Sequence, residues 1–193
     1  MEMPHWMDEY PEWALKDAPS TEALKDYRPL DKISNIVIYR SSSRPNNMVF
    51  VPEGNSVENN LGFVILYKIK TDGYKLPAYG IYNIFLKPQL RGQRFAIRFY
   101  HYLLDKGATM LTTGTLNTDS MRVWSSLVRD PSVNIWGEDH RTENVKYYQL
   151  TIDKSGMVQP VVSGNSEDQP RDFHDIDYVA SKMYNRLEGS EAE

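Results

Sequence analysis

The stretch from Tyr79 to Leu127 constrains the fold most, because a succession of elements can be assigned there from the residue pattern alone. Residues 78–86 are nearly continuous in β-branched and aromatic side chains, as expected of a strand covered on both faces. A turn with a glycine, an amphipathic helix, a second strand and a second helix follow. Strands separated by a helix long enough to cross over are expected to be parallel. The sequence therefore predicts a central β-α-β-α unit.

The first predicted helix, residues 93–106, opens almost directly after this strand, once Pro88 has ended it. Its apolar side chains recur at intervals of four residues: Phe95, Phe99 and Leu103. Gly107 is expected to end the helix. A helix that begins in this way presents unpaired backbone N–H groups at the positive end of its dipole, which suits a phosphate or pyrophosphate. Arg91 and Arg94 would add positive charge there.

This passage resembles the acetyl-coenzyme A site of the GNAT superfamily of N-acetyltransferases, whose turn reads Arg/Gln-x-x-Gly-x-Gly/Ala between a central strand and its helix. The matching residues are Arg91-Gly92-Gln93-Arg94-Phe95-Ala96, preceded by Leu86-Lys87-Pro88. The resemblance continues through the strand expected over residues 109–116 and the helix over residues 117–127. That helix begins at Asn117, similar to the family's Asn-x-x-Ala/Ser pattern. On the flanks, only the order of elements is similar.

The resemblance implies both a fold and a function. The fold class would be α/β (α+β), with a GNAT-like mixed central sheet, an antiparallel meander leading into the β-α-β-α unit, helices on both faces and an extra C-terminal helix. The function would be transfer of an acyl group from acetyl-CoA, or another acyl-CoA, to an amine of a protein or small molecule. The residues implied to bind the cofactor are Leu86, Arg91, Gly92, Gln93, Arg94, Phe95, Ala96 and Asn117.

Two residues depart from the family pattern. Arg94 stands at the middle glycine, where its side chain would either crowd the approach to a pyrophosphate or pair with phosphate oxygens. Trp124 stands where many members carry a tyrosine that protonates the departing thiolate, and an indole N–H cannot act as that acid. The central strand offers only Tyr79, Tyr82 and Asn83 as candidate catalytic groups, with no carboxylate or histidine.

Composition removes several classes of function. The chain has no cysteine, which excludes disulfides, thiolate metal sites and cysteine nucleophiles. Its four histidines lack ligand spacing, so we expect exposed or supporting imidazoles and no metal site. No apolar run approaches the roughly 18 residues of a membrane span, and the acidic N-terminus is unlike a signal peptide. We therefore expect a soluble protein of the cytoplasm, without membrane partners.

Positive charge is concentrated on the motif stretch. Residues 75–131 hold eight basic and three acidic side chains, whereas residues 1–31 and 164–193 each hold eight acidic and three basic ones. This partition fits a polyanionic cofactor bound to the centre of the chain, and solvated helix faces balanced by acidic ends explain it equally well. The net charge of −4 argues against a nucleic-acid partner.

Three consecutive parts are predicted along the chain. Residues 1–32, with four prolines and four aromatic side chains, would form an N-terminal arm packed on the domain or on a partner subunit, with Ser20 capping a short helix. Residues 33–155 would form the acyl-CoA-binding domain. Residues 156–193 would form a linker and an amphipathic helix, which would dock on the domain or on a second copy. The apolar stripe of that helix is Phe173, Ile176, Val179, Ala180, Met183 and Leu187.

Within the predicted domain, strands are expected over residues 33–40, 48–51, 61–70, 133–136 and 145–153. The tyrosines of residues 145–152 either line a site or lie half-buried in a sheet. An alternative function follows from Arg94, Trp124 and the aromatic arm. It is a catalytically inactive GNAT-fold binding or structural protein, of the kind that tailed phages carry, located in the host cytoplasm or the virion.

Overall fold

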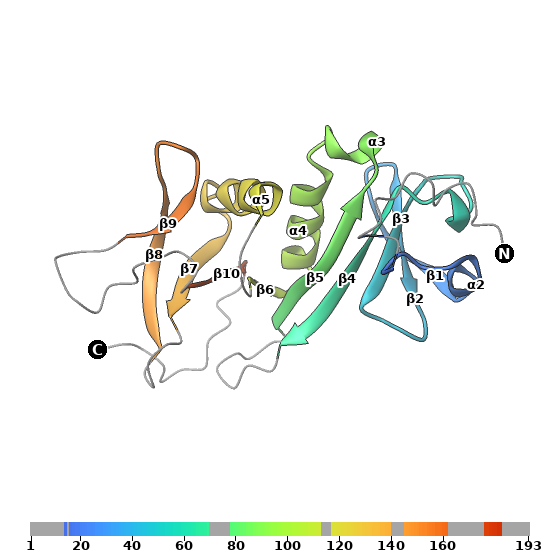
Figure 1. Ribbon diagram of the computed structural model, residues 1–193, viewed down its shortest axis with the longest axis horizontal. Coiled ribbons are helices and arrows are strands. Elements are labelled where there is room, and N and C mark those ends of the chain that lie inside the picture. Colours follow the sequence, from blue (N-terminus) through green and yellow to red (C-terminus); the bar gives the residue numbers. More distant parts are fainter. Residues whose placement is uncertain are drawn as a thin grey trace. The chain divides into compact units, whose positions relative to one another are not determined.

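The computed structural model, shown in Figure 1, describes residue 14 and residues 16–69, 78–112, 117–139, 145–161 and 176–182. The strands are β1 (Tyr27–Ile33), β2 (Ile36–Ser41), β3 (Asn47–Pro52), β4 (Gly62–Ile69), β5 (Ala78–Leu86), β6 (Thr109–Leu111), β7 (Asn134–Asp139), β8 (Lys146–Ile152), β9 (Val158–Pro160) and β10 (Asp177–Ser181). The helices are α2 (Thr21–Leu24), the 3-10 turn η2 (Val57–Asn59), α3 (Pro88–Arg91), α4 (Phe95–Asp105) and α5 (Thr118–Val128). The expected mixed α+β class is confirmed.

The chain forms two compact units, and each is described by itself. Unit 1 comprises residues 1–67 and 81–99, and unit 2 comprises residues 68–80 and 100–193. The strands β4 and β5 and the helix α4 contribute residues to both units. Among the described residues, no helix has the length and apolar character needed to cross a membrane.

Unit 1 is built on the predicted antiparallel meander. The strands β1, β2, β3 and β4 pair antiparallel in chain order, and β5 lies next to β4. The prediction of an N-terminal arm over residues 1–32 is wrong for the last residues of that range, because Tyr27–Ile33 is the strand β1. Pro29 concealed this strand. It is tolerated because β1 is the first strand in the described order and bulges between Pro29 and Asp31.

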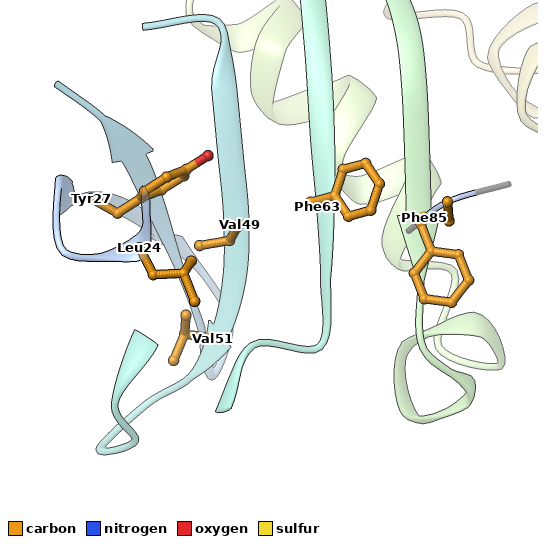
Figure 2. Packing of buried hydrophobic residues seen from close by; sticks show 7 residues of the cluster. Leu24, Tyr27, Val49, Val51, Phe63 and Phe85 are labelled. Carbon is orange, nitrogen blue, oxygen red and sulfur yellow. The ribbon is translucent and has the colours of Figure 1, made fainter. Parts of the chain in front are cut away.

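One face of the unit 1 sheet buries the apolar cluster drawn in Figure 2. Its members are Ala14, Leu24, Tyr27, Val49, Val51, Phe63 and Phe85. Leu24 belongs to α2, which Ser20 caps as predicted by accepting the N–H of Ala23 at 3.2 Å. Leu24 and Tyr27 of the predicted arm therefore pack on their own chain.

The other face of the unit 1 sheet carries the start of α4. Side chains alternate between the two faces of a strand, so Phe50 of β3 lies opposite its neighbours in the cluster. Its ring meets those of Phe95 and Phe99 edge to face, with centroids 4.8 and 5.0 Å apart. All three side chains are fully buried. Helical segments thus cover both faces of this sheet, as expected.

A close approach of two backbones positions the end of β5, from which the site begins. Gly62, at the start of β4, has a φ of +154°, and a Cβ at this position would lie 2.2 Å from the carbonyl oxygen of Phe85. Only glycine leaves room for that contact. The N–H of Lys87 then donates to the carbonyl of Leu61 at 2.8 Å, which holds the exit of β5 against the entry of β4.

Unit 2 contains the predicted parallel pair. Ala78 and Tyr79 of β5 pair in parallel with Thr109 and Met110 of β6. The strands continue in the order β6-β10-β7-β8-β9, with antiparallel pairing throughout. The helix that crosses over between the parallel strands, α4, ends at Asp105, and the predicted glycine Gly107 follows it with a φ of +82°. The remainder of the strand expected over residues 109–116 lies outside the described residues beyond Thr112.

The prediction of a C-terminal helix is wrong for the residues that the structure describes, because Asp177–Ser181 is the strand β10. Tyr178, Val179, Ala180 and Ser181 are consecutively buried, which is the pattern of a strand covered on both faces. The strand lies between β6 and β7 and supplies backbone partners to both. This non-local pairing overrides the helical spacing of the apolar residues. Within the predicted linker, Val158–Pro160 likewise forms the strand β9.

Some predictions fall on residues outside the described ranges. They are the aromatic residues of the arm before Ala14, the last residue of the strand expected over residues 61–70, and the ends of the predicted C-terminal helix. The strand expected over residues 133–136 is longer in the structure, because β7 continues through Gly137 to Asp139. A Cβ on Gly137 would lie 2.6 Å from Cγ2 of Ile176, so a larger residue there would displace that side chain.

Candidate functional site

The junction between β5 and α4 contains most of the residues that resemble the cofactor turn, and it lies within unit 1. In place of the predicted open turn, the chain first makes the short helix α3, with Pro88 in its first turn. Gly92 ends α3 with a φ of −72°, and a Cβ built on it meets no atom within 4 Å. The backbone therefore does not require glycine at residue 92.

Arg94 adopts the conformation that glycine favours. Its φ is +54°, in the left-handed region, and it directly precedes α4. The N–H of Arg98 donates to the carbonyl of Arg94 at 3.1 Å. The carbonyl of Arg94 therefore accepts the first helical hydrogen bond of α4. The backbone here keeps a glycine-like geometry although the side chain is arginine.

The first amides of α4 lack partners within the described part of the chain. No described residue accepts a hydrogen bond from the N–H of Phe95, Ala96 or Ile97, and Arg94 has no side-chain acceptor that could cap them. We call these three groups the open amides. They carry the partial positive charge of the helix start and fit an anionic group such as a phosphate.

Three arginines lie near the open amides, and two of them are engaged by the protein. Nε of Arg91 donates to the carbonyl of Leu86 at 2.6 Å, and its guanidinium lies 5.3 Å from the ring centroid of Phe85. Nη1 of Arg98 donates to Oγ of Ser34 at 2.9 Å. The exposed guanidinium of Arg94 makes no hydrogen bond or ion pair with any described residue. Arg94 is thus the cation available to a ligand.

The other residues of the turn have structural roles. Gln93 is exposed, and its Nε2 donates to the carbonyl of Gln89 at 2.9 Å. Phe95 is fully buried against Phe50, so its side chain belongs to the core and only its N–H faces the candidate site. Ala96 and Leu86 are half-buried. Binding of a cofactor by these residues stays a prediction.

The candidate catalytic residues do not all belong to the same unit. Tyr82 and Asn83 belong to unit 1, whereas Tyr79 belongs to unit 2 and is half-buried. The side chain of Tyr82 is 63% exposed. The Nδ2 of Asn83 donates to Oδ2 of Asp17 at 2.7 Å.

Asp17 is a carboxylate that the sequence did not indicate. It lies 66 residues before Asn83 in the chain, within a segment that was interpreted only as an irregular arm. The one local signal is the pair Ala14 and Ala18, whose spacing of four residues fits one helical turn. The tertiary structure alone places this carboxylate at β5.

The second predicted helix begins with a side-chain cap. Asn117 caps α5 by accepting the N–H of Ser120 on its Oδ1 at 2.8 Å, so this oxygen is used by the protein itself. Asn117 lies in unit 2, and its support of a cofactor stays a prediction.

Trp124 is a core residue of unit 2. It is 1% exposed, and its ring lies between those of Tyr100 and Tyr178, with centroids 6.0 and 5.9 Å away. The tyrosines of β8 are half-buried sheet residues, since Tyr148 pairs with Gly137 and Tyr147 with Glu138 on β7. Trp124 is therefore a structural residue of the core.

The strongest carboxylate shifts lie at turns. Hydrogen bonds from the Ser43 N–H and from the hydroxyls of Ser41 and Ser43 lower the pKa of Asp26 to about 2. Hydrogen bonds to Ser132 lower the pKa of Asp130, which also lies 3.4 Å from Nε2 of His101. In the described ranges, no three histidine or acidic side chains converge as a metal site would require.

Comparisons with known proteins leave the family open. No family model matches the chain, and no curated protein matches it. Among solved structures, the ribosomal-protein-S18-alanine N-acetyltransferase from Escherichia coli aligns over 96% of both chains, with 10% identity and a TM-score of 0.33. A putative acetyltransferase of the GNAT family from Bacteroides thetaiotaomicron aligns over 81% of this chain and 70% of its own, with 16% identity and a TM-score of 0.32. Similarity at this level carries no argument about function.

Proposed function

We propose that this chain is a divergent GNAT-type N-acyltransferase that uses acetyl-CoA or another acyl-CoA and acts on an amine of a protein or small molecule in the cytoplasm. The observation that carries the proposal is the set of open amides beside the unpaired guanidinium of Arg94. They follow a buried strand at the residues that resemble the family's cofactor turn. The parallel pairing of β5 with β6 supports the same arrangement of elements.

The roles of the residues follow from their chemistry. The open amides would donate hydrogen bonds to phosphate oxygens, and Arg94 would add a charge-assisted contact to them. Arg91 would keep its present role and hold the exit of β5 through the carbonyl of Leu86. When bound, the cofactor supplies a thioester whose C–S bond breaks as the amine nitrogen forms the new C–N bond, and an amine proton goes to the departing thiolate. Trp124 supplies no proton, because it is an indole buried in the core.

Calorimetric titration with acetyl-CoA tests the proposal. We expect binding to the unaltered protein and a weaker affinity, by about 10-fold to 100-fold, in the variant Arg94→Glu, because a hydrogen bond to a charged group is lost and repulsion replaces it. Arg122→Glu is the matched control. It makes the same change of charge on an exposed arginine of α5 that is paired with Asp119. Absence of binding to the unaltered protein, or equal loss in both variants, would reject the proposal.

Turnover can be followed without interference from the protein. The chain contains no cysteine, so every thiol released in a reaction with a thiol reagent comes from the cofactor. A panel of amines with acetyl-CoA would separate an enzyme from the alternative, a catalytically inactive GNAT-fold binding or structural protein. The burial of Trp124 at the family's acid position favours that alternative. Cofactor binding without turnover of any amine would support it.

A further inference from the structure

The strands β1 and β2 of unit 1 place two arginines directly opposite each other. Arg28 of β1 pairs with Arg40 of β2 in the antiparallel register, and both side chains are exposed. Residues at such opposite positions point to the same face of a sheet, with Cβ atoms about 5 Å apart. Because like charges at this separation repel each other, the pair reduces the stability of the sheet.

No carboxylate pairs with either arginine within the described part of the chain. Nη1 of Arg28 donates to the backbone carbonyls of Lys25 and Tyr27, at 2.7 and 2.9 Å. These bonds orient the guanidinium of Arg28 but do not neutralise it. Arg40 makes no hydrogen bond or ion pair with any described residue. Both guanidinium groups therefore keep donors for a ligand outside the chain.

The carboxylate of Asp26, two residues before Arg28, is occupied by neutral donors. Its Oδ2 accepts hydrogen bonds from the hydroxyl of Ser41, the N–H of Ser43 and the hydroxyl of Ser43, at 2.7, 2.8 and 2.7 Å. Hydrogen bonds from Ser43 and Ser41 lower the pKa of Asp26 to about 2, and the charge of Arg28 contributes less than they do. Asp26 thus holds the loop after β2 and forms no ion pair with Arg28.

An exposed apolar side chain follows Arg28 on β1. Leu30 is 40% exposed, and it is the extra residue of the bulge between Pro29 and Asp31, without a partner on β2. A bulge of this kind re-aims a side chain. Pro29 is exposed and has no N–H, so a further strand cannot pair regularly with this edge of the sheet. The edge therefore offers side chains to a partner: two cations and one leucine.

Three locally unfavourable features coincide here: a like-charge pair, an exposed leucine and a bulge. Such departures are expected where a surface serves a function. We infer that Arg28, Arg40 and Leu30, which we call the arginine edge, bind an acidic segment of another protein. Carboxylates of that segment accept hydrogen bonds from both guanidinium groups and remove their repulsion, while an apolar side chain covers Leu30.

The chemistry of the arginine edge favours a protein segment over a nucleic acid. A phosphate backbone would use the arginines but would leave Leu30 uncovered, and β1 and β2 carry no exposed aromatic ring on which a base could stack. The net charge of −4 also disfavours a nucleic acid. This inference goes beyond the proposed acyltransferase function and does not depend on it.

Binding of short model peptides to the full chain tests the inference. One peptide alternates glutamate and leucine, a second has glutamine in place of every glutamate, and a thymidine oligonucleotide of equal length is the third probe. Fluorescence anisotropy measures affinity, and backbone amide shifts in NMR spectra identify the bound residues. Arg40→Glu is the test variant, because it breaks no contact of Arg40 with a described residue. Arg122→Glu, on an exposed arginine of α5, is the matched control.

We expect the acidic peptide to bind and to shift the amides around the arginine edge. Arg40→Glu should weaken this binding by about 10-fold, because a charge-assisted contact is lost and repulsion replaces it. It should also raise Tm by about 1–4 °C, because an opposite-charge pair with Arg28 replaces the like-charge pair. Leu30→Ser should weaken binding without lowering Tm. Arg122→Glu should leave the affinity unchanged and should not raise Tm.

The inference is overturned if the acidic peptide does not bind, if its amide shifts lie away from the arginine edge, or if Arg40→Glu and Arg122→Glu weaken binding equally. Equal affinity for the glutamine peptide would overturn it because charge would play no part. Equal affinity of the oligonucleotide for the same residues would overturn it because the surface would accept any polyanion. A lower Tm in Arg40→Glu would show that Arg40 supports the fold instead of a partner. None of these results involves acetyl-CoA, so they are separate from the test of the proposed function.

Discussion

The two helices α4 and α5 have the same length of 11 residues, but only the first turn of α5 has a side-chain cap among the described residues. At α5, the side chain of Asn117 accepts the N–H of Ser120 and so satisfies one of the free amides. At α4, Arg94 holds a left-handed backbone conformation, offers no acceptor and leaves the amides of the first turn open. The cap satisfies one amide of α5 within the chain, whereas the first amides of α4 are left to water or to an anionic group.

The largest expected effect is a loss of stability from a substitution in α5. Trp124→Ala should reduce the free energy of unfolding by about 3–5 kcal/mol, because it removes a fully buried ring that packs between Tyr100 and Tyr178. Urea denaturation followed by circular dichroism measures this change. Arg129→Ala, at the end of the same helix, serves as a control and should change it by less than about 0.5 kcal/mol. A loss below about 1 kcal/mol in Trp124→Ala would mean that α5 is not held by this contact.

The next effect concerns the open helix. Ala96→Pro removes one open amide in the first turn of α4, where a proline is structurally tolerated. We expect the affinity for acetyl-CoA to fall by about 10-fold, as for the loss of one hydrogen bond to a charged group. Asp119→Pro is the matched control, because Asp119 is the second residue of α5 as Ala96 is of α4. Equal affinities in the unaltered protein and Ala96→Pro would show that the open amides bind no anion.

Loss of the cap should have an effect of about 1 kcal/mol. Asn117→Ala leaves the N–H of Ser120 without its acceptor and should reduce the free energy of unfolding by that amount. Asn117→Ser keeps a capping oxygen and should recover most of the loss in the same denaturation experiment. If Asn117→Ser restores stability but lowers the affinity for acetyl-CoA, then Asn117 also supports the cofactor, as the family resemblance implies.

A smaller effect, of opposite sign, is expected at Arg94. Glycine adopts a φ of +54° without the steric cost that arginine carries, although it also increases the entropy of the unfolded chain. Arg94→Gly should therefore raise the free energy of unfolding by up to about 1 kcal/mol, while it weakens the binding of acetyl-CoA. A variant that loses stability would show that the arginine side chain itself supports the fold, and the comparison of the two helix starts would then fail.

The smallest expected effect is a pH dependence of stability that arises at Asp26 in unit 1. There the carboxylate accepts the N–H of Ser43, so this amide has a partner within the chain. The carboxylate of Asp26 accepts the N–H of Ser43 at 2.8 Å, and its pKa falls from 3.8 to about 2. Since the folded pKa is the lower one, this contribution to stability is complete above about pH 4 and is lost as the pH falls towards 2. The difference in Tm between the unaltered protein and Asp26→Asn should shrink over that interval. A constant difference would contradict the assignment.

Local residue patterns predicted the elements on which the site is built. The bounds of β5 agree with the prediction, Gly107 follows α4, and Ser20 caps α2. Each depends on neighbouring residues only: an apolar run, a positive φ after a helix, or a hydroxyl before one. The open start of α4 was also expected from the short connection after the strand, although the intervening helix α3 was not.

Other features depend on contacts between residues far apart in the chain. The spacing of Ile176, Val179 and Met183 is helical, yet β10 forms because β6 and β7 both offer backbone partners to it. Pro29 hides β1 from any pattern, because proline is acceptable there only at the edge of a sheet.

The sequence by itself determined the bounds of β5, the glycine that follows α4 and the cap of α2, because local residue preferences decide these features. Only the tertiary structure decided which carboxylate meets β5 and which tryptophan is buried. Asp17 and Asn83, which form a hydrogen bond, are 66 residues apart in the chain. Trp124 packs against Tyr178, which lies on β10, a strand whose residue pattern predicted a helix. Such pairings result from the closure of long loops and the burial of apolar surface, and no local periodicity records them.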